Sequence, residues 1–230
     1  LMAVPAILVM RQPDLGTTIL MVATGIAMLF LVGVRIWVFV AGALATIAAV
    51  IPLWQFVLLD YQKKRLLTFI DPEKDPLGAG YHILQSKIAL GSSGLFGKGF
   101  LEGSQSHLSF LPEKQTDFIF TMLAEEFGLV GGLVLIGLYM LLLIYAFAIS
   151  LRCRSQFGRL MGMGVSTSFF LNIFVNIAMV MGVVPVVGMP LPLISYGGTA
   201  MLTLMFSFGL LLNVYVHRDV QIGPGAADGN

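Results

Sequence analysis

The residues best suited to chemistry gather in one stretch, 110–128, of a chain that is otherwise poor in charge. Its five ionisable groups are Glu113, Lys114, Asp117, Glu125 and Glu126. Pro112 suits the first turn of a helix, where a missing N–H costs nothing. A helix that began there would place Glu113, Asp117 and Glu125 on one face, because residues four apart are neighbours on a helix surface. Carboxylates on such a face are groups that can transfer protons.

A purely structural interpretation of this stretch is also open. Acidic residues are favoured at helix N-termini, so Thr116 or Asp117 could cap a helix while Glu125 is solvated. Spacing alone does not choose between the two interpretations. The choice depends on the elements that position the stretch.

The composition predicts a membrane protein. Hydrophobic residues make up 57% of the chain and charged residues 11%, whereas about a quarter of a soluble domain is charged. Several apolar runs are close to the ~20 residues that cross a bilayer as a helix. We therefore expect an all-α fold, a polytopic transmembrane helical bundle that forms a single membrane domain over 1–230. The approximate spans are 1–10 (partial), 15–34, 36–59, 119–151, 160–182 and 190–214.

The positions of positive charge in short loops predict the orientation of these spans. The loop 152–159 carries three arginines and should be cytoplasmic. The long connection 60–118 is then extracytoplasmic, and the half-length first span suggests the later part of a longer membrane protein. Within the connection we expect a short amphipathic helix over 81–90. The glycine-rich segment 91–99 is interpreted as a flexible hinge.

A second unusual stretch is 182–199, in which three prolines precede Gly197 and Gly198. A helix broken at membrane depth must have its backbone groups satisfied by protein or by a water-lined cavity. The stretch is either a structural kink or a polar groove lined by Ser195 and Tyr196, and we expect its two glycines to permit close backbone approach. In the preceding span, Asn172 and Asn176 are expected to form interhelical hydrogen bonds.

These stretches together resemble the SEDS family (shape, elongation, division and sporulation). The resemblance rests on motifs at 12–16, 71–81 and 85–89, on Phe110-Leu-Pro-Glu-Lys-Gln-Thr-Asp-Phe-Ile-Phe120, and on Pro190-Leu-Pro-Leu-Ile-Ser-Tyr-Gly-Gly198. It covers nearly the whole chain, which matches the family roughly from its fifth of ten spans onward. Val187 stands where the division branch commonly carries a lysine, and this favours the elongation branch.

The resemblance implies a peptidoglycan glycosyltransferase that polymerises lipid II on the outer face of the bacterial cytoplasmic membrane during elongation. It implies a glycan substrate linked to undecaprenyl diphosphate. It also implies partnership with a class B penicillin-binding protein and with other membrane proteins of the elongation complex. Nothing in the sequence suggests nucleic acid as a partner. The essential aspartate of the family corresponds to Asp117.

This reaction would need a base and a site for a diphosphate. A sugar 4-hydroxyl must attack an anomeric carbon that bears the lipid diphosphate, and Asp117 would accept the proton as general base. The departing diphosphate needs cations, supplied by Lys and Arg or by a divalent ion such as Mg or Mn. No metal-binding motif is recognisable, so a cofactor remains undefined. The candidate substrate-binding residues are Lys63, Arg65, Lys98, Glu113, Lys114 and Ser195.

Two other functions remain as alternatives: a flippase or transporter of lipid-linked precursors, and a non-catalytic scaffold of the elongation complex. Transporters tend to place ionisable residues near the bilayer midplane. In this chain the charge lies at the external ends of the spans, which favours chemistry at the membrane surface. A scaffold would tolerate the loss of Asp117.

Overall fold

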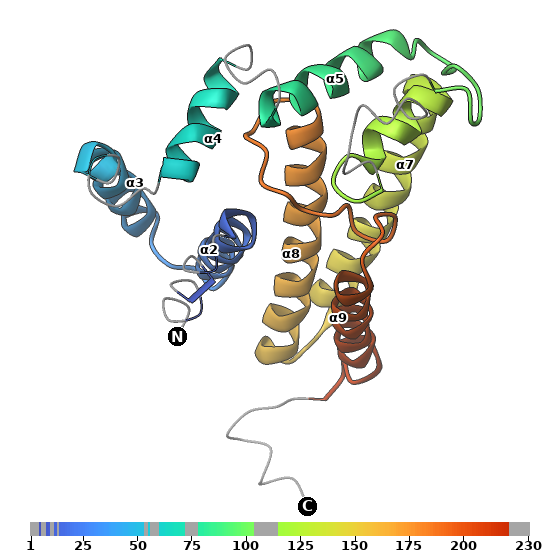
Figure 1. Ribbon diagram of the computed structural model, residues 1–230. Coiled ribbons are helices and arrows are strands. Elements are labelled where there is room, and N and C mark those ends of the chain that lie inside the picture. The colour runs from blue at the N-terminus through green and yellow to red at the C-terminus, as the bar shows by residue number, and fades with distance from the viewer. Residues whose placement is uncertain are drawn as a thin grey trace, which may run out of the picture.

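The computed structural model describes residues 14–52, 60–71, 78–103 and 115–220, together with residues 5, 8, 9, 12 and 55. This described part contains helices and no strands, which confirms the expected all-α fold (Figure 1). The helices are α2 (Leu15–Leu31), α3 (Ile36–Pro52), α4 (Asp60–Ile70), α5 (Ala79–Ser92), α7 (Ile119–Arg152), α8 (Gln156–Val180) and α9 (Gly198–Val216).

The core of the bundle lies between α7, α8 and α9, and α2 packs against the other side of α8. Buried residues of α7 recur every three or four positions, as at Leu135, Tyr139 and Leu143, because that face lies against its neighbours. The outer face of the same helix exposes Leu133, Leu138 and other large apolar side chains. An apolar surface of this kind suits a lipid environment.

Three helices, α7, α8 and α9, are long and apolar enough to cross a membrane, and the apolar helices α2 and α3 are shorter. The chain is therefore a polytopic membrane protein. The predicted spans 15–34, 119–151 and 160–182 overlap α2, α7 and α8. Helix α3 covers the first part of the predicted span 36–59, and most of 53–59 and of the partial span 1–10 lies outside the described residues. The predicted span 190–214 begins too early, because residues 190–197 are not helical and α9 starts only at Gly198.

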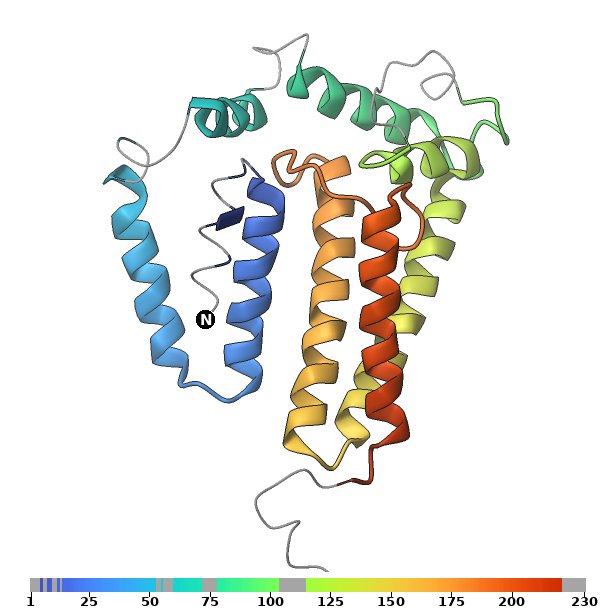
Figure 2. The same ribbon diagram turned by 60° about the horizontal axis from the view of Figure 1, so that its bottom comes forward.

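In its described residues, the long connection contributes helices α4 and α5, which lie across one end of the bundle. Figure 2 shows α4 and α5 at this end, where α7 begins, while the α2–α3 and α7–α8 turns lie at the opposite end. The helix α5 contains the short helix expected over 81–90. The polar connection therefore covers the end of the bundle that carries residues 115–118.

Helix α7 is interrupted near this end, at Gly128, whose φ of 68° and ψ of −163° are not helical. At about 1.5 Å per residue, the part below the break, 129–152, spans roughly 36 Å. That length already exceeds the ~30 Å hydrocarbon core of a bilayer. The part above the break, 119–127, can therefore lie at the membrane surface together with Asp117.

Candidate active site

Asp117 lies in a turn, 115–118, that directly precedes α7. Helix α7 begins at Ile119 with Phe118 as its N-cap residue, so the helix expected from Pro112 is not continuous through Asp117. The N-cap position is held by Phe118 and not by Thr116 or Asp117, and the expectation that Glu125 is solvated is wrong because Glu125 is fully buried. Asp117 is half-buried, so part of the residue remains accessible.

The loop between α8 and α9 holds this turn through two hydrogen bonds. The Ser195 hydroxyl donates to the carbonyl of Thr116 at 2.5 Å, and the Tyr196 amide donates to the carbonyl of Gln115 at 2.9 Å. Ser195 also accepts a hydrogen bond from the Leu191 amide at 2.7 Å. Ser195, which the sequence predicted to bind substrate, is therefore engaged in joining the α8–α9 loop to the turn that carries Asp117.

Helix α8 supplies a third attachment of the Asp117 turn, through Asn176. The sequence predicted for Asn176 only an interhelical hydrogen bond. The Asn176 amide group donates to the carbonyl of Asp117 at 3.0 Å and to that of Met189 at 2.6 Å. Asn176 is fully buried, and its Oδ1 finds no hydrogen-bond partner among the described residues. The expectation of an interhelical hydrogen bond is wrong for Asn172, whose amide group donates to the carbonyl of Ser168 in its own helix.

The Asp117 carboxylate faces Gly188, in the same α8–α9 loop. A Cβ built on Gly188 would lie 3.5 Å from Asp117 Oδ2, and Gly188 has a φ of +71° that favours glycine. The expected close approach at Gly197 and Gly198 is wrong. A Cβ on Gly198 would meet nothing within 4 Å, and one on Gly197 would make an ordinary contact with Ala200.

Helix α5 covers the turn and the first residues of α7. The Ser86 hydroxyl lies 2.9 Å from that of Thr121 and donates to the carbonyl of Val180 at 2.8 Å. The His82 ring lies 6.2 Å from the ring of Phe118, the neighbour of Asp117. This face of α5 was missed from the sequence, although Ser86 lies in the 85–89 motif and in the helix expected over 81–90.

Two of the basic residues predicted to hold a diphosphate, Lys63 and Lys98, have described side chains. Lys63 is half-buried on α4, which contacts α5. Lys98 instead forms an ion pair with Glu125, its Nζ lying 2.8 Å from Glu125 Oε1. The side chain of Arg65, and Glu113 and Lys114 as a whole, lie outside the described residues.

One cation near the turn was missed from the sequence. The exposed Lys87 of α5 extends over Gly182, at the end of α8. A Cβ built on Gly182 would lie 2.2 Å from Lys87 Cε and 2.7 Å from its Nζ. Lys87 directly follows Ser86, so its ammonium group belongs to the same end of the bundle as Asp117.

Within the described ranges, no three His, Cys, Asp or Glu side chains come together as a group that could hold a metal ion. The described residues therefore do not supply a protein-borne metal site.

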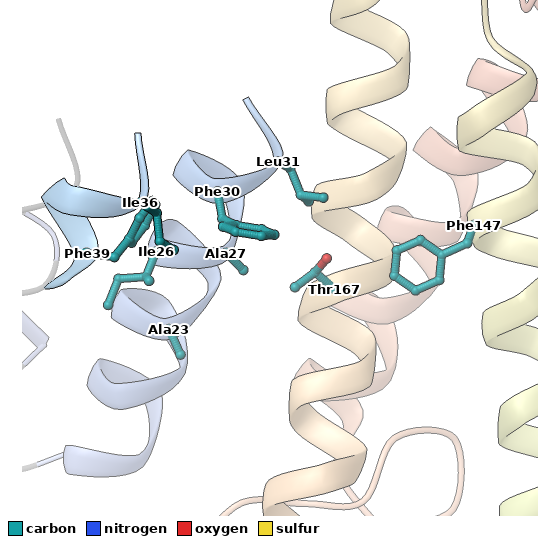
Figure 3. Close-up of a pocket in the computed structure, with 9 residues that line it drawn as sticks. All are labelled: Ala23, Ile26, Ala27, Phe30, Leu31, Ile36, Phe39, Phe147 and Thr167. Carbon is teal, nitrogen blue, oxygen red and sulfur yellow. The ribbon is translucent and has the colours of Figure 1, made fainter. Parts of the chain in front are cut away.

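A pocket of about 550 Å³ lies away from Asp117, between the α2–α3 turn and helices α7 and α8 (Figure 3). Its lining is apolar apart from Thr167, and Phe30, Phe39 and Phe147 provide most of its aromatic surface. It contains no charged side chain that could act on a sugar or a diphosphate. This pocket therefore does not supply the candidate chemistry.

A first prediction concerns Ser195. Replacing Ser195 with alanine leaves the Leu191 amide and the Thr116 carbonyl without their present partner, which should cost about 1–3 kcal/mol of unfolding free energy. Thermal unfolding of the purified protein measures this loss. Ser207→Ala is the matched control, because that hydroxyl donates within α9. Unchanged stability with complete loss of activity would instead make Ser195 a substrate contact.

Comparison with known proteins places these features in one family. The family model FTSW_RODA_SPOVE, described as a cell cycle protein, matches residues 1–220. Peptidoglycan glycosyltransferase MrdB of Escherichia coli strain K12 is 53% identical over 219 residues, covering 95% of this chain and 59% of the relative. Peptidoglycan glycosyltransferase RodA of Treponema pallidum strain Nichols is 48% identical over 158 residues, covering 69% of this chain and 36% of the relative.

A solved structure with the same fold belongs to a peptidoglycan synthase complex, described as showing structural coordination of polymerization and crosslinking. The TM-score is 0.76 at 32% sequence identity, and the match covers 95% of this chain and 61% of the solved chain. The chain thus spans about three fifths of the length of MrdB and of this solved chain. These matches confirm the family resemblance predicted from the motifs.

Proposed function

Because the chain belongs to the FtsW, RodA and SpoVE family of cell cycle proteins, we propose that it carries the active site of a peptidoglycan glycosyltransferase that polymerises lipid II during cell elongation. The observation that carries the proposal is the Asp117 carboxylate. It is accessible at one end of the bundle, on a turn whose backbone is fixed by Asn176, Ser195 and Tyr196. The relatives named peptidoglycan glycosyltransferase support the reaction class.

In the proposed reaction, the 4-hydroxyl oxygen of one substrate sugar attacks the anomeric carbon of the other. A new glycosidic C–O bond forms, the C–O bond to the diphosphate breaks, and undecaprenyl diphosphate leaves with the bonding electrons. Asp117 accepts the hydroxyl proton, and a positioned base of this kind typically contributes about 10²–10⁴-fold. A fixed turn favours this role because it holds the carboxylate in place before the substrate binds.

The negative charge of the departing diphosphate requires cations at the same end of the bundle. The basic side chains of the connection supply them in this proposal, with Lys63, Arg65 and Lys114 from the sequence analysis and Lys87 added on its position over Gly182. A Mg or Mn ion carried by the diphosphate itself is compatible with this arrangement. It would neutralise charge on the leaving group.

The acceptor hydroxyl gives a chemical test of the proposed function. A transferase needs this hydroxyl, whereas a flippase or a scaffold does not use it. The full-length protein, purified in detergent, should convert lipid II into polymer and should be unable to extend an analogue whose acceptor 4-hydroxyl is replaced by hydrogen. Equal handling of the two lipids, with no polymer from either, would contradict the proposal.

We propose that the Asp117 end of the bundle faces outward from the bacterial cytoplasmic membrane. The arginines at 152–159 lie at the opposite end, and positive charge in short loops favours the cytoplasmic side. In a Cys153→Ser background, Ser92→Cys should react with a membrane-impermeant maleimide on intact spheroplasts. Arg154→Cys, exposed at the other end, should react only after lysis. The reverse pattern would overturn this orientation.

We also propose a class B penicillin-binding protein as partner, within the set of membrane proteins that direct elongation. Support comes from the likeness to a chain of a peptidoglycan synthase complex in which polymerization and crosslinking are coordinated. Coupling of this kind is chemically useful, because a new glycan strand is the substrate of crosslinking. Polymerisation should therefore be measured with and without the partner.

A further inference from the structure

The proposed chemistry does not explain the break in α7 at Gly128. The break divides the helix into a short upper piece, 119–127, and a long lower piece, 129–152. The upper piece begins directly after the Asp117 turn. Its orientation therefore helps to set where the carboxylate lies.

The glycine-rich loop 94–99 fills the break. Interruption of a helix leaves backbone groups that need other partners, and four hydrogen bonds between the loop and α7 provide them. They run from Lys98 N to Glu125 O (3.0 Å), Gly99 N to Glu126 O (3.1 Å), Leu129 N to Gly94 O (3.1 Å) and Val130 N to Leu95 O (3.1 Å). The interpretation of 91–99 as a flexible hinge is therefore not supported.

Two glycines make this backbone contact possible. A Cβ built on Gly97 would lie 2.1 Å from the carbonyl oxygen of Glu126, and one on Gly128 would lie 2.3 Å from the Gly97 nitrogen. Both residues also have positive φ angles, +80° and +68°, which side chains disfavour. The loop and the break consequently fit together only with glycine at both positions.

An ion pair fixes the loop to the upper piece. Glu125 is fully buried, and Lys98 reaches it at 2.8 Å while keeping 28% of its own side chain exposed. A buried carboxylate is unfavourable unless a cation or hydrogen bonds compensate it. The pair therefore opposes any sliding of the loop along α7.

The upper piece is also held at its other end and in its middle. Asn176 holds the carbonyl of Asp117, and Ser86 joins Thr121 to the end of α8. At about 1.5 Å per residue this piece is only about 13 Å long. A shift at the break is therefore expected to reach the Asp117 turn rather than be absorbed within the piece.

We infer that Lys98, Glu125 and the loop 94–99 form a brace that positions Asp117 by fixing the break in α7. This inference rests on the proposed function, since it assigns the brace to that same site. Lys98 then acts through Glu125 and not as a ligand of the diphosphate. Misplacement of a reacting group by about 1 Å can cost on the order of 100-fold in rate.

The first test replaces Gly128 with alanine in the full-length protein. The substitution should lower kcat for lipid II polymerisation by about tenfold or more, with KM within about threefold, because the base is displaced and the substrate contacts remain. Gly137→Ala is the matched control on the same helix, since a Cβ there meets nothing within 4 Å. A normal kcat for Gly128→Ala would overturn the inference.

The second test uses the ion pair and does not depend on Gly128→Ala folding. Lys98→Met and Glu125→Gln should each lower kcat, and the double variant should be little worse than either, as expected for residues that act together. Lys98→Arg should recover most of kcat. If Lys98 bound the diphosphate, Lys98→Met would raise KM, and its effect would add to that of Glu125→Gln. That result would overturn the inference.

A readout without substrate separates this inference from the proposed function. The Tyr196 amide donates to Gln115, in the Asp117 turn, and its hydrogen exchange reports on that turn. Exchange at Tyr196 should be faster in Lys98→Met than in the unaltered protein or in Gly137→Ala. Unchanged exchange in Lys98→Met would overturn the brace even if lipid II is the substrate. Absence of polymer from the unaltered protein would refute the proposed function alone.

Discussion

Asp117→Asn is expected to abolish glycan polymerisation by the full-length protein while its fold is retained. Asparagine has nearly the same shape, and the hydrogen bond from Asn176 goes to the backbone carbonyl of residue 117, which the substitution leaves in place. The side chain is half-buried, so the unfolding free energy should change by no more than about 1 kcal/mol. Removal of the base should lower the rate by about 10²–10⁴-fold.

The measurement compares polymer yield and thermal unfolding of the same preparation. Glu102→Gln is a suitable control, because it removes an exposed carboxylate from the same polar connection. Binding of the penicillin-binding partner should also be unchanged in Asp117→Asn. Near-normal polymer from this variant would return Asp117 to a structural role and make Glu113 the next candidate base.

The second large effect is expected for Asn176→Leu. This change keeps the branched shape of the side chain, although leucine is larger, and it removes the donor that holds the carbonyls of Asp117 and Met189. Each carbonyl left buried without a partner costs about 1–3 kcal/mol, so the loss of two partners should lower the unfolding free energy by about 2–6 kcal/mol. The turn that carries Asp117 would lose its attachment to α8, and polymerisation should fall by about tenfold or more.

Asn172→Leu provides the comparison, one helical turn earlier in α8. Its amide group donates to Ser168 within the same helix, so this substitution should change the unfolding free energy by less than about 1 kcal/mol. Thermal unfolding and polymer yield of the two variants are measured together. Equal behaviour of the two variants would show that the attachment of Asp117 to α8 does not matter.

The helices could be predicted largely from composition, since a run of about 20 apolar residues has few other stable structures. The helix ends were harder to place. The prolines and glycines of 182–199 indicated a break, but they did not reveal that Pro190 to Gly197 would remain non-helical. Here the Tyr196 amide donates to the carbonyl of Gln115 instead of to a carbonyl of its own segment, and the Ser195 hydroxyl donates to the carbonyl of Thr116. Those partners are far away in sequence.

The sequence predicted the central residue of the candidate site but not the residues that surround it. Asp117 was indicated by its motif and by its place beside an apolar span. The partner of Lys98 was not predictable, because Glu125 lies 27 residues away and the two meet only when the loop 94–99 enters the break in α7. The charge of Lys98 suggested a ligand for phosphate, whereas in the structure Lys98 pairs with the buried carboxylate of Glu125.

The central claim, that this protein polymerises lipid II at the Asp117 end of the bundle, is tested most directly without a bilayer. In detergent micelles there is no transport across a membrane, so only a transferase can change lipid II. We expect the purified full-length protein, with its penicillin-binding partner, to produce a ladder of glycan polymer on a gel, and the Asp117→Asn variant to produce none. Unchanged lipid II with the unaltered protein, or equal ladders from both proteins, would contradict the claim.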